Sequence, residues 1–295
     1  MMNNTIYALG FFDGVHLGHQ ALLKACRELA AENGCGTGVV TFLGHPDELV
    51  AGKKTPLINT PSDRRHLLNR FGMERIVELP FDEDLMRLPW QDFYRMLKDQ
   101  YGAAGVVCGH DFRFGNRGEG NALLLEQVCT ADGIPCRVIP EQLLDGITVS
   151  STHIRKLLEQ GDLEQAEKFL GHRHIFTGKV IRGQQLGRRL GTPTANLSLS
   201  SDLLTLPYGV YICRAKAEGI DCPAVTNIGL RPTVSGEGVT VEPWLLDYEG
   251  NLYDQELTLE FHKFLRPEKK FSSLEELRRE IVKNAEQTRR YFEER

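Results

Sequence analysis

Residues 10–19 read GFFDGVHLGH, and they lie between a predicted strand and a predicted helix. The preceding run, Thr5–Phe12, is short and almost continuously apolar, which is typical of a strand buried on both faces. In the following run, Gly18–Asn33, the apolar residues share one helical face, and Gly34 is expected to end the helix. A strand that turns directly into a helix is characteristic of an open α/β sheet, in which ligands bind at the carboxyl ends of the strands.

The same alternation of short apolar runs and helical periodicity continues through the first half of the chain. Further strands are predicted at Gly38–Phe42, Arg75–Leu79, Ala104–Cys108 and Cys136–Ile139. Further helices are predicted at Pro61–Phe71, Gln91–Tyr101, Ala122–Ala131, Thr152–Glu159 and Leu163–Leu170. Strands separated by helices of roughly this length predict βαβ units and a parallel sheet.

The pattern changes after residue 174, where short alternating stretches are separated by Gly, Pro, Asn and Asp. These stretches are Ile175–Ile181, Gly209–Ala217, Val239–Asp247 and Glu256–Phe264. Such spacing predicts an antiparallel barrel or sandwich. One amphipathic helix, Ser273–Phe292, is expected to close the chain. We therefore expect two domains, residues 1–171 and residues 172–295.

Composition excludes several classes of protein. The chain has 295 residues, of which 41% are hydrophobic and 25% charged, and these ordinary values exclude a disordered, collagenous or coiled-coil protein. Its formal net charge of -5 gives no basic excess to attract nucleic acid. The seven cysteines are odd in number and form no CxxC pair, which argues against a disulfide framework and a zinc ribbon. With no leader-like or membrane-length apolar run, we expect a cytoplasmic protein with no nucleic-acid or membrane partner, of unknown oligomeric state.

The turn at residues 10–19 has the chemistry of a phosphate site. His16 and His19 are three residues apart, so both can face one side and donate hydrogen bonds to phosphate oxygens. The helix N-terminus adds free N–H groups and the positive end of a dipole, and Gly14 and Gly18 let the backbone approach a ligand. No Walker A motif occurs in the chain, and no GxGxxG motif in this turn. The alternative is that the two histidines only cap the helix.

The His-x-Gly-His order after a first strand resembles the nucleotidyltransferase superfamily. Three further segments lie at predicted strand ends or helix starts: TFLGHP at 41–46, GHDFRFG at 109–115 and SSTHIR at 150–155. Together with the second half, these segments resemble the bacterial bifunctional riboflavin kinase/FAD synthetase family over essentially the whole chain. The resemblance implies a Rossmann-like α/β nucleotidyltransferase domain, followed by a small antiparallel β-barrel domain with a C-terminal helix.

In the first domain the resemblance implies that His16 and His19 are catalytic and stabilise the phosphates of ATP while pyrophosphate leaves. The other residues that it assigns to ATP are Phe12, Asp13, Gly14, Gly18, Ser151, Thr152 and Arg155. Two hydroxyls at a helix start, with an arginine one turn on, also suit a phosphate on chemical grounds, although a plain N-cap would look the same. The resemblance assigns Asp111, Phe112 and Phe114 to flavin or nucleotide binding, and the sequence does not separate these two roles.

The second domain has its own glycine-rich segment, GRRLGTPTAN at 187–196. A glycine-rich backbone can cradle phosphate, and Thr194 and Asn196 present oxygens on one side of an extended segment, which suits Mg²⁺. A simple turn before a strand is the alternative. The resemblance implies ATP binding by Gly187, Arg188, Gly191, Thr194 and Asn196, with the metal on the last two.

Glu242 follows an alternating stretch and could accept the proton of a ribityl hydroxyl as a general base. The resemblance implies that role, whereas a lone strand carboxylate more often faces solvent. The chain departs from the family at Gly44, at His153, at Pro243-Trp244 and at Asn284. We expect Pro243 to limit local strand pairing to an edge, and we assign no role to Asn284.

Two reactions follow from the resemblance, with ATP as co-substrate and Mg²⁺ as cofactor. Riboflavin and ATP give FMN and ADP in the second domain, and FMN and ATP give FAD and pyrophosphate in the first. The expected partners are thus riboflavin, FMN, FAD and ATP. One alternative is a different His-x-Gly-His adenylyltransferase, acting on pantetheine phosphate or nicotinate mononucleotide. The other is a flavin-binding regulator without catalytic activity.

Overall fold

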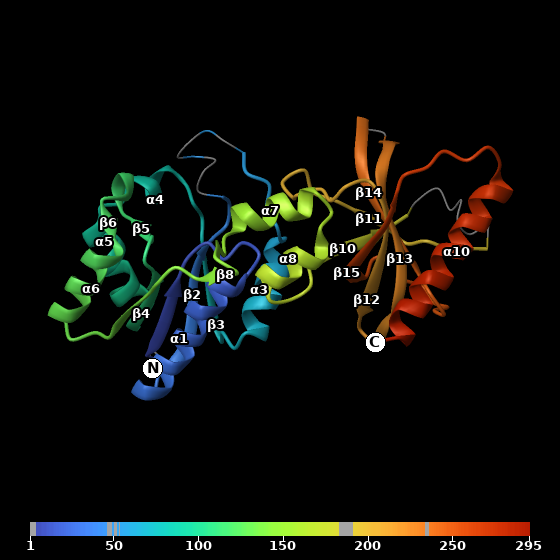
Figure 1. The fold of residues 1–295 in the computed structure, drawn as a ribbon. Coiled ribbons are helices and arrows are strands. Elements are labelled where there is room, and N and C mark those ends of the chain that lie inside the picture. The colour runs from blue at the N-terminus through green and yellow to red at the C-terminus, as the bar shows by residue number, and fades with distance from the viewer. Residues whose placement is uncertain (1–3, 46–48, 50–51, 53, 183–190, 234–235) are drawn as a thin grey trace. The chain divides into compact units, whose positions relative to one another are not determined.

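The computed structural model describes residues 4–45, 49, 52, 54–182, 191–233 and 236–295. The chain forms two compact units, which can be followed in Figure 1. The first unit comprises Met1–Leu57 and Pro61–Ser151, and the second comprises Ile58–Thr60 and Thr152–Arg295. In this division residues 152–171 group with the second unit, whereas the sequence placed them in the first. The boundary between the two functions stays a prediction.

The first unit is built on a parallel sheet of strand order β3-β2-β1-β4-β7, as the sequence predicts. The strands are β1 (Thr5–Leu9), β2 (Gly36–Phe42), β3 (Arg75–Leu79), β4 (Ala103–Gly109) and β7 (Cys136–Ile139). All five residues of β1 are buried, because this strand is central and helices cover the sheet. The chain leaves β1 toward β2 on one side and later returns to β4 on the other. This reversal creates a ligand-binding crevice at the carboxyl ends of β1 and β4.

Helices connect these strands. They are α1 (Leu17–Asn33), α3 (Pro61–Arg70), α4 (Glu83–Arg87), α5 (Trp90–Arg95) and α6 (Ala122–Ala131). Helix α1 ends where the sequence predicts, because Gly34 takes the left-handed conformation with φ +62°. The helix expected at Gln91–Tyr101 is α5 continued by a π-helical turn, Met96–Gln100.

Short elements of the first unit were not predicted. Helix α4 is one of them, with Asp82 as its N-cap. A 3-10 helix at Asn116–Gly118 is another. Two small hairpins were also not predicted, and each of their strands has only two residues. The strands are β5 (Arg113–Phe114) with β6 (Gly120–Asn121), and β8 (Leu143–Leu144) with β9 (Ile147–Thr148). Such short strands carry no hydrophobic period by which a sequence could show them.

Apart from Ile58–Thr60, the second unit begins at Thr152 within α7 (Ser151–Glu159). It continues through α8 (Leu163–Leu170) into a closed barrel of order β10-β11-β14-β13-β12-β15. The barrel strands are β10 (Ile175–Ile181), β11 (Asn196–Ser198), β12 (Gly209–Ala217), β13 (Ile220–Thr233), β14 (Gly236–Leu245) and β15 (Glu256–Pro267). Helix α10 (Leu274–Glu293) follows, and the Ser273 hydroxyl caps it by accepting the Glu276 N–H. The barrel and the terminal helix are as predicted.

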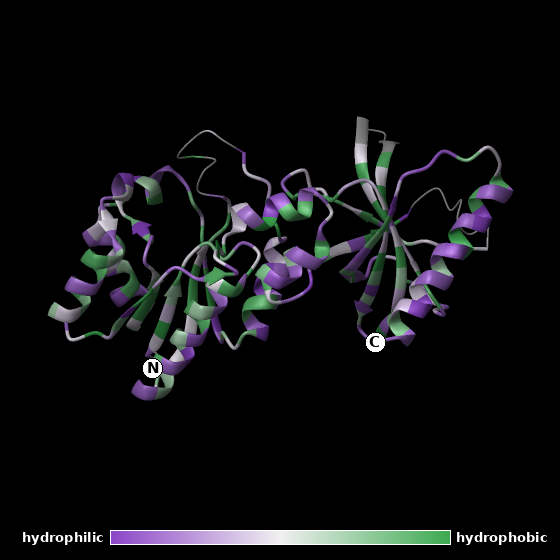
Figure 2. Cartoon of the chain, viewed as in Figure 1, coloured by the Kyte–Doolittle hydropathy of each residue, from purple (hydrophilic) through white to green (hydrophobic). Residues whose placement is uncertain are grey.

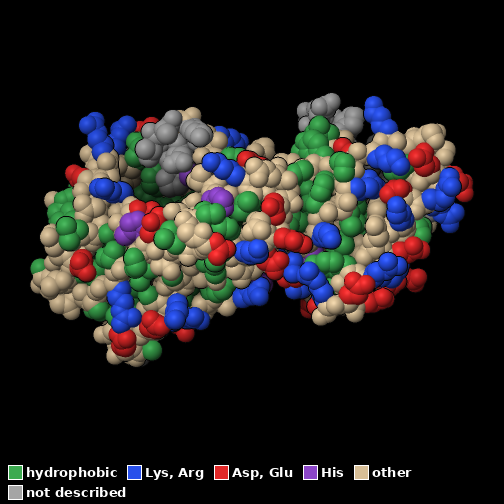
Figure 3. Space-filling model, viewed as in Figure 1, with side chains coloured by type: hydrophobic (Ala, Val, Ile, Leu, Met, Phe, Trp, Pro, Cys, Tyr) green, Lys and Arg blue, Asp and Glu red, His purple; other side chains and the backbone are tan. Residues whose placement is uncertain are grey.

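Each unit buries its own apolar residues. Figure 2 shows hydrophobic residues along the strands of both sheets and mixed hydropathy along α10. On the face that Figure 3 shows, basic and acidic side chains are interspersed over both units. In the part of the chain that the structure describes, no helix combines the length and the apolarity needed to cross a bilayer.

Candidate active sites

The turn between β1 and α1 has a strained backbone. Phe12, Gly14 and Val15 have φ of 59°, 83° and 40°, in the left-handed region that favours glycine. Phe12 and Val15 are fully buried, so the surrounding packing holds them in this conformation. Residues held in such conformations cluster at functional sites. Packing therefore fixes the conformation of this turn, which lies at the sheet edge where ligands are expected to bind.

His16 and His19 stand side by side at the start of α1. His16 is the N-cap, and its Nδ1 accepts a hydrogen bond from the backbone N–H of His19 at 3.3 Å. The two rings stack, with centroids 3.7 Å apart and planes at 14°. Because Nδ1 is the acceptor, the proton of a neutral His16 lies on Nε2, from which it can be donated to a ligand. Burial, followed by the charges of His16 and Arg64, holds the pKa of His19 well below its usual range.

At both predicted glycines of this turn, the local structure explains why a larger residue would not fit. Gly14 takes a positive φ, as noted above. A Cβ atom at Gly18 would lie 3.1 Å from the His16 ring, so the missing side chain leaves room for the imidazole. Gly18 therefore acts on the site through the position of His16 as well as through its own backbone.

A cavity of about 600 Å³ opens at this edge of the sheet, and we call it the histidine cavity. It brings together segments that are far apart in the sequence. Of the predicted site residues, it is lined by His16, Gly18, His19, Asp111, Phe112 and Ser151. The Ser151 hydroxyl donates a hydrogen bond to the Asp13 carbonyl at 2.8 Å, which fastens the SSTHIR segment to the turn after β1.

The remaining residues predicted for ATP lie elsewhere. Phe12 and Asp13 are completely buried behind the cavity wall, and the Phe12 ring packs 5.1 Å from the His19 ring. Thr152 and Arg155 lie on α7, where Thr152 is exposed and Arg155 is buried. Gly14 is buried in the turn after β1 and does not line the cavity either. For these five residues a contact with ATP stays a prediction.

A second cavity of the first unit, of about 890 Å³, is predominantly apolar, and we call it the aromatic cavity. Its apolar lining residues are Phe42, Leu49, Phe81, Leu85, Met86, Phe93 and Phe114. Phe112 lines the histidine cavity and Phe114 the aromatic cavity, although their rings stack 5.7 Å apart. Phe42 and Arg113 line both cavities. The GHDFRFG segment therefore forms part of the boundary between the two.

In the second unit the strand register brings the predicted kinase residues together. The Ala195 N–H donates to the Pro243 carbonyl at 2.9 Å, and Leu197 pairs with Val241. Asn196 therefore lies opposite Glu242, and Asn227 of β13 lies opposite Glu242 on its other side. Residues opposite one another in antiparallel strands point to the same face. The barrel thus carries a row of three polar side chains across β11, β14 and β13.

The expectation that Pro243 would limit local pairing to an edge is wrong. Strand β14 pairs with β13 through Pro243, which lies opposite Thr226, and with β11 on its other side. The N and the carbonyl of a strand residue point to the same side, and the carbonyl of Pro243 accepts from Ala195. The missing N–H of the proline therefore faces the β11 side, and the β13–β14 hydrogen bonds are kept.

Glu242 is buried rather than facing solvent. Only 7% of it is exposed, and the Thr240 hydroxyl donates to its Oε1 at 3.0 Å. It lines a cavity of about 270 Å³, the Glu242 cavity, together with Thr192, Thr194 and Asn227. The apolar part of the lining consists of Val210, Val225, Trp244, Phe271, Leu277 and Ile281. A buried carboxylate beside an apolar wall can act on a hydroxyl held there.

A second cavity of the barrel, of about 280 Å³, lies beside residues 193–195 of the glycine-rich segment, and we call it the Tyr248 cavity. It is lined by Pro193, Thr194, Ala195, Tyr248, Tyr253 and nearby residues. Thr194 lines both this cavity and the Glu242 cavity. Gly191 is exposed, with φ +74°, whereas the predicted residues Gly187 and Arg188 lie outside the described residues.

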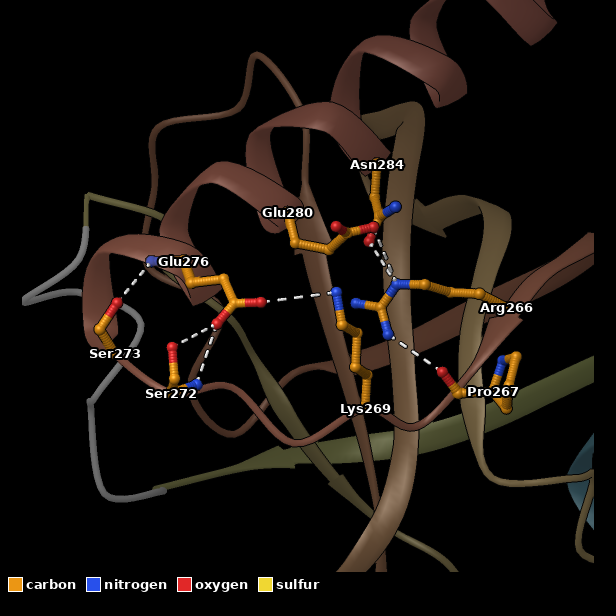
Figure 4. Close-up of polar contacts among 8 residues, drawn as sticks. All are labelled: Arg266, Pro267, Lys269, Ser272, Ser273, Glu276, Glu280 and Asn284. Atoms are coloured by element: carbon orange, nitrogen blue, oxygen red, sulfur yellow. Dashed lines mark hydrogen bonds and ion pairs between the residues drawn. The ribbon is translucent and has the colours of Figure 1, made fainter.

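Sequence reasoning missed a polar network at the end of β15, drawn in Figure 4. Arg266 Nε donates to Asn284 Oδ1 at 3.2 Å, lies 3.5 Å from Glu280 Oε1, and its Nη1 donates to the Pro267 carbonyl. Asn284 is 2% exposed and lines the Glu242 cavity, although no role for it is predicted from the sequence. The departure from the family at Asn284 thus lies in the wall of the Glu242 cavity, where the amide oxygen accepts a hydrogen bond from Arg266.

The donors beside Glu242 fit Mg²⁺. Thr194, Asn196 and Glu242 offer oxygen atoms, and Mg²⁺ is held by few protein oxygens while keeping waters and substrate phosphates as its other ligands. Among the described residues there is no cluster of three His, Cys, Asp or Glu side chains able to hold a metal. The few oxygen donors beside Glu242 would suit a metal whose other ligands are the phosphates of a nucleotide.

The chain matches two family models, one for each part. Residues 1–153 match the model of FAD synthetase, and residues 170–292 match the model of riboflavin kinase. The FAD synthetase match includes the His-x-Gly-His turn and the whole parallel sheet. The riboflavin kinase match includes the barrel and nearly all of α10.

Similar proteins cover nearly the whole chain. A bifunctional riboflavin kinase/FMN adenylyltransferase of Pseudomonas fluorescens is 38% identical, over 94% of this chain and 89% of its own. One from Bacillus subtilis is 33% identical, over 98% and 92%. A crystal structure from Streptococcus pneumoniae, described as a macrolide-efflux protein, has a TM-score of 0.85 and 26% identity over 98% of this chain and 95% of that one. That description applies to the Streptococcus protein.

Proposed function

The chain belongs to the family of bifunctional riboflavin kinases/FMN adenylyltransferases, and we propose that each of its two units carries one of the two reactions. The enzyme phosphorylates riboflavin to FMN with ATP and then adenylylates FMN to FAD with release of pyrophosphate. The observation that carries the division is that each unit has its own cavity lined by the residues the sequence predicts to be catalytic.

In the first unit the histidine cavity would take the phosphates of ATP. A neutral His16 can donate from Nε2, and the N-terminus of α1 adds free N–H groups and the positive end of its dipole. These donors suit the negative charge that develops as the α-phosphorus is attacked. An oxygen of the FMN phosphate forms the new bond, the bond to pyrophosphate breaks, and no covalent enzyme intermediate is needed.

The aromatic cavity would take the flavin ring system. Its volume of about 890 Å³ and its phenylalanine lining suit a large aromatic ligand. The FMN phosphate must reach the α-phosphorus of ATP, so it belongs where the two cavities meet. Arg113 lines both cavities and is exposed, so a cation is available there for two phosphate groups. Under this proposal Asp111 and Phe112 would contact the nucleotide, and Phe114 would contact the flavin.

In the second unit riboflavin would lie in the Glu242 cavity and ATP in the Tyr248 cavity. Thr194 lines both cavities, so the terminal phosphate and the ribityl hydroxyl would meet beside it. The Glu242 carboxylate would take the hydroxyl proton as the hydroxyl oxygen attacks the γ-phosphorus and ADP leaves. Asn196 and Asn227, on either side of Glu242, would orient the groups around this carboxylate.

Mg²⁺ would be held by Thr194 and Asn196 together with the phosphates of ATP. When bound, it neutralises charge on the phosphates that react and leave. The residues of this chain position the metal and the hydroxyl, and Gly191 and the glycine-rich segment before it would contact the phosphates. Removal of Mg²⁺ with EDTA should stop FMN formation, and added Mg²⁺ should restore it.

Chromatography of flavins after incubation with riboflavin, ATP and Mg²⁺ tests the function directly. FMN should appear first and FAD after it. A parallel panel with pantetheine phosphate and nicotinate mononucleotide tests the alternative adenylyltransferase. Flavin binding without turnover would favour the regulator instead. The cytoplasmic location stays a prediction from the sequence.

A further inference from the structure

Arg64 of α3 is a buried cation that contacts two residues lining the histidine cavity. It is 3% exposed. Its Nη1 donates to the Phe11 carbonyl at 3.2 Å, and its Nη2 donates to the Phe42 carbonyl at 2.7 Å. The guanidinium also lies 4.7 Å from the centre of the Phe11 ring. One side chain thus contacts both the turn after β1 and the last residue of the neighbouring strand β2.

Both carbonyls belong to the rim of the site. Phe11 lies in the turn that follows β1 and leads to His16, and Phe42 is the last residue of β2. Both residues line the histidine cavity. The Thr41 hydroxyl also donates to the Phe11 carbonyl at 2.8 Å. A planar guanidinium can hold two acceptors in a fixed geometry, which an ammonium group does less well.

Among the titratable groups near Arg64, which include Glu78 and Arg65, two bear on the histidine turn. Asp13 is buried in the same turn and is the largest favourable charge for Arg64, whose pKa is lowered by burial. His19 is the other neighbour, and the charge of Arg64 disfavours a second positive charge there. The other titratable groups near His19 are His16 and, along the cavity lining, His110, Asp111, Arg113 and Glu141.

We propose that Arg64 is a positioning residue for adenylyl transfer, which holds the Phe11 and Phe42 backbone so that the turn after β1 presents His16 and His19 to the nucleotide. The inference rests on the proposed function, because it concerns the same cavity. Arg64 lies behind the wall and acts through the turn. Its charge adds a second effect, because it helps to keep His19 neutral at the pH at which the reaction proceeds.

The test compares Arg64→Gln and Arg64→Lys in the full chain, with Arg65→Gln as the matched control. Arg65 is the next residue of the same helix, and it forms a surface ion pair with Glu78 at 2.8 Å. FAD formation from FMN is measured from pH 5 to 9 for each variant. FMN formation from riboflavin and thermal unfolding are recorded on the same samples as controls of folding.

For Arg64→Gln we expect kcat for FAD formation to fall by about 100-fold, because a small misplacement of reacting groups costs about that much. The acid limb of its pH profile should move to higher pH, because a positive charge near His19 has been removed. Arg64→Lys keeps the charge but not the two-pronged geometry, so its rate should fall while the acid limb stays. Arg65→Gln should match the wild type.

Two results would overturn the inference. One is a wild-type rate in Arg64→Gln, and the other is an equal loss in both Arg64 variants with an unmoved acid limb, which would mean packing alone. If Arg64→Gln does not fold, Arg64→Lys decides, because an unchanged rate in that variant contradicts the positioning role. Failure of the wild type to make FAD would instead overturn the proposed function.

Discussion

The backbone N–H of His19 donates to Nδ1 of His16, and the two imidazole rings lie stacked with their centroids 3.7 Å apart. This contact unites the two interpretations that the sequence left open. His16 does cap helix α1, and the capping bond occupies Nδ1. The same bond places the proton of the neutral ring on Nε2, from which it can be donated in a hydrogen bond to a phosphate oxygen. Capping therefore orients His16 for its predicted role.

Replacing both histidines, His16→Ala with His19→Ala, should reduce FAD formation from FMN by at least about 10²–10³-fold. The loss of one donor to a transition state typically costs that much. FMN formation from riboflavin should remain at the wild-type rate, because we assign that reaction to the other unit. Separate assays of the two half-reactions check this, and wild-type adenylylation in the double variant would contradict the role of the pair.

Arg113→Ala should raise the KM for FMN in FAD formation by about 10-fold or more, which corresponds to about 1.4 kcal/mol. Arg113 lies where the two cavities of the first unit meet, and among the described residues no carboxylate pairs with it. The control is Arg95→Ala, which removes an exposed arginine paired with Asp92 at 2.7 Å. An Arg113 variant that saturates with FMN like the control would exclude a phosphate contact there.

The barrel should lose stability in mild acid. His174 and His262 are buried, and burial is the main reason why the pKa of each is lowered to about 3, with nearby positive charges as the second cause. Both remain neutral in the folded state, whereas in the unfolded chain they take up a proton below a pH of about 6.5. The free energy of unfolding is therefore unaffected above that pH. Below it, the free energy falls by up to about 1.4 kcal/mol per pH unit for each histidine, down to a pH of about 3.

Urea unfolding at pH 7.5, 6 and 5 tests this prediction. In a Trp90→Phe background, Trp244 of β14 reports on the barrel alone, because the chain has two tryptophans. His262→Phe removes one titrating ring from beside Tyr291 and Phe292 and should flatten the pH dependence. Equal slopes for this variant and its parent would mean that His262 is not held neutral.

The parallel sheet could be predicted because its strands are buried on both faces. β1, for example, reads as one apolar run, and Gly34 marks the end of α1. Strand β13 was missed because Pro223, Asn227 and Gly229 interrupt its pattern, although β12 and β14 pair with it over its length. Pairing between strands, rather than local preference, makes this segment a strand.

The residues of the candidate sites, too, could be predicted only where a local sequence motif indicates them. His16, His19 and Glu242 could be found because each lies in a local motif with recognisable chemistry. Arg64 and Arg266 could not, because their roles depend on contacts with carbonyls and side chains that are distant in the sequence. Asn284 was set aside as a departure from the family, yet the fold buries it in the wall of the Glu242 cavity. Such roles require the three-dimensional arrangement.

Glu242→Gln should lower riboflavin phosphorylation by about 10²–10⁴-fold, which is the usual value of general-base assistance. Glutamine keeps the size of the side chain and an acceptor for the Thr240 hydroxyl, but it has no basicity. Riboflavin and ATP should still bind, because Thr194 and the rest of the lining of both barrel cavities are unchanged. Equilibrium binding of riboflavin to the variant, compared with the wild type, separates lost chemistry from lost binding.

The division of the two reactions between the two units is tested most directly by assaying both half-reactions in Glu242→Gln and in the double histidine variant, side by side in the full chain. Flavins are separated by chromatography after incubation with ATP and Mg²⁺ and either riboflavin or FMN. Our account predicts opposite outcomes: Glu242→Gln converts FMN to FAD but scarcely phosphorylates riboflavin, and the histidine variant converts riboflavin to FMN and stops there. Loss of both activities in either folded variant would contradict it.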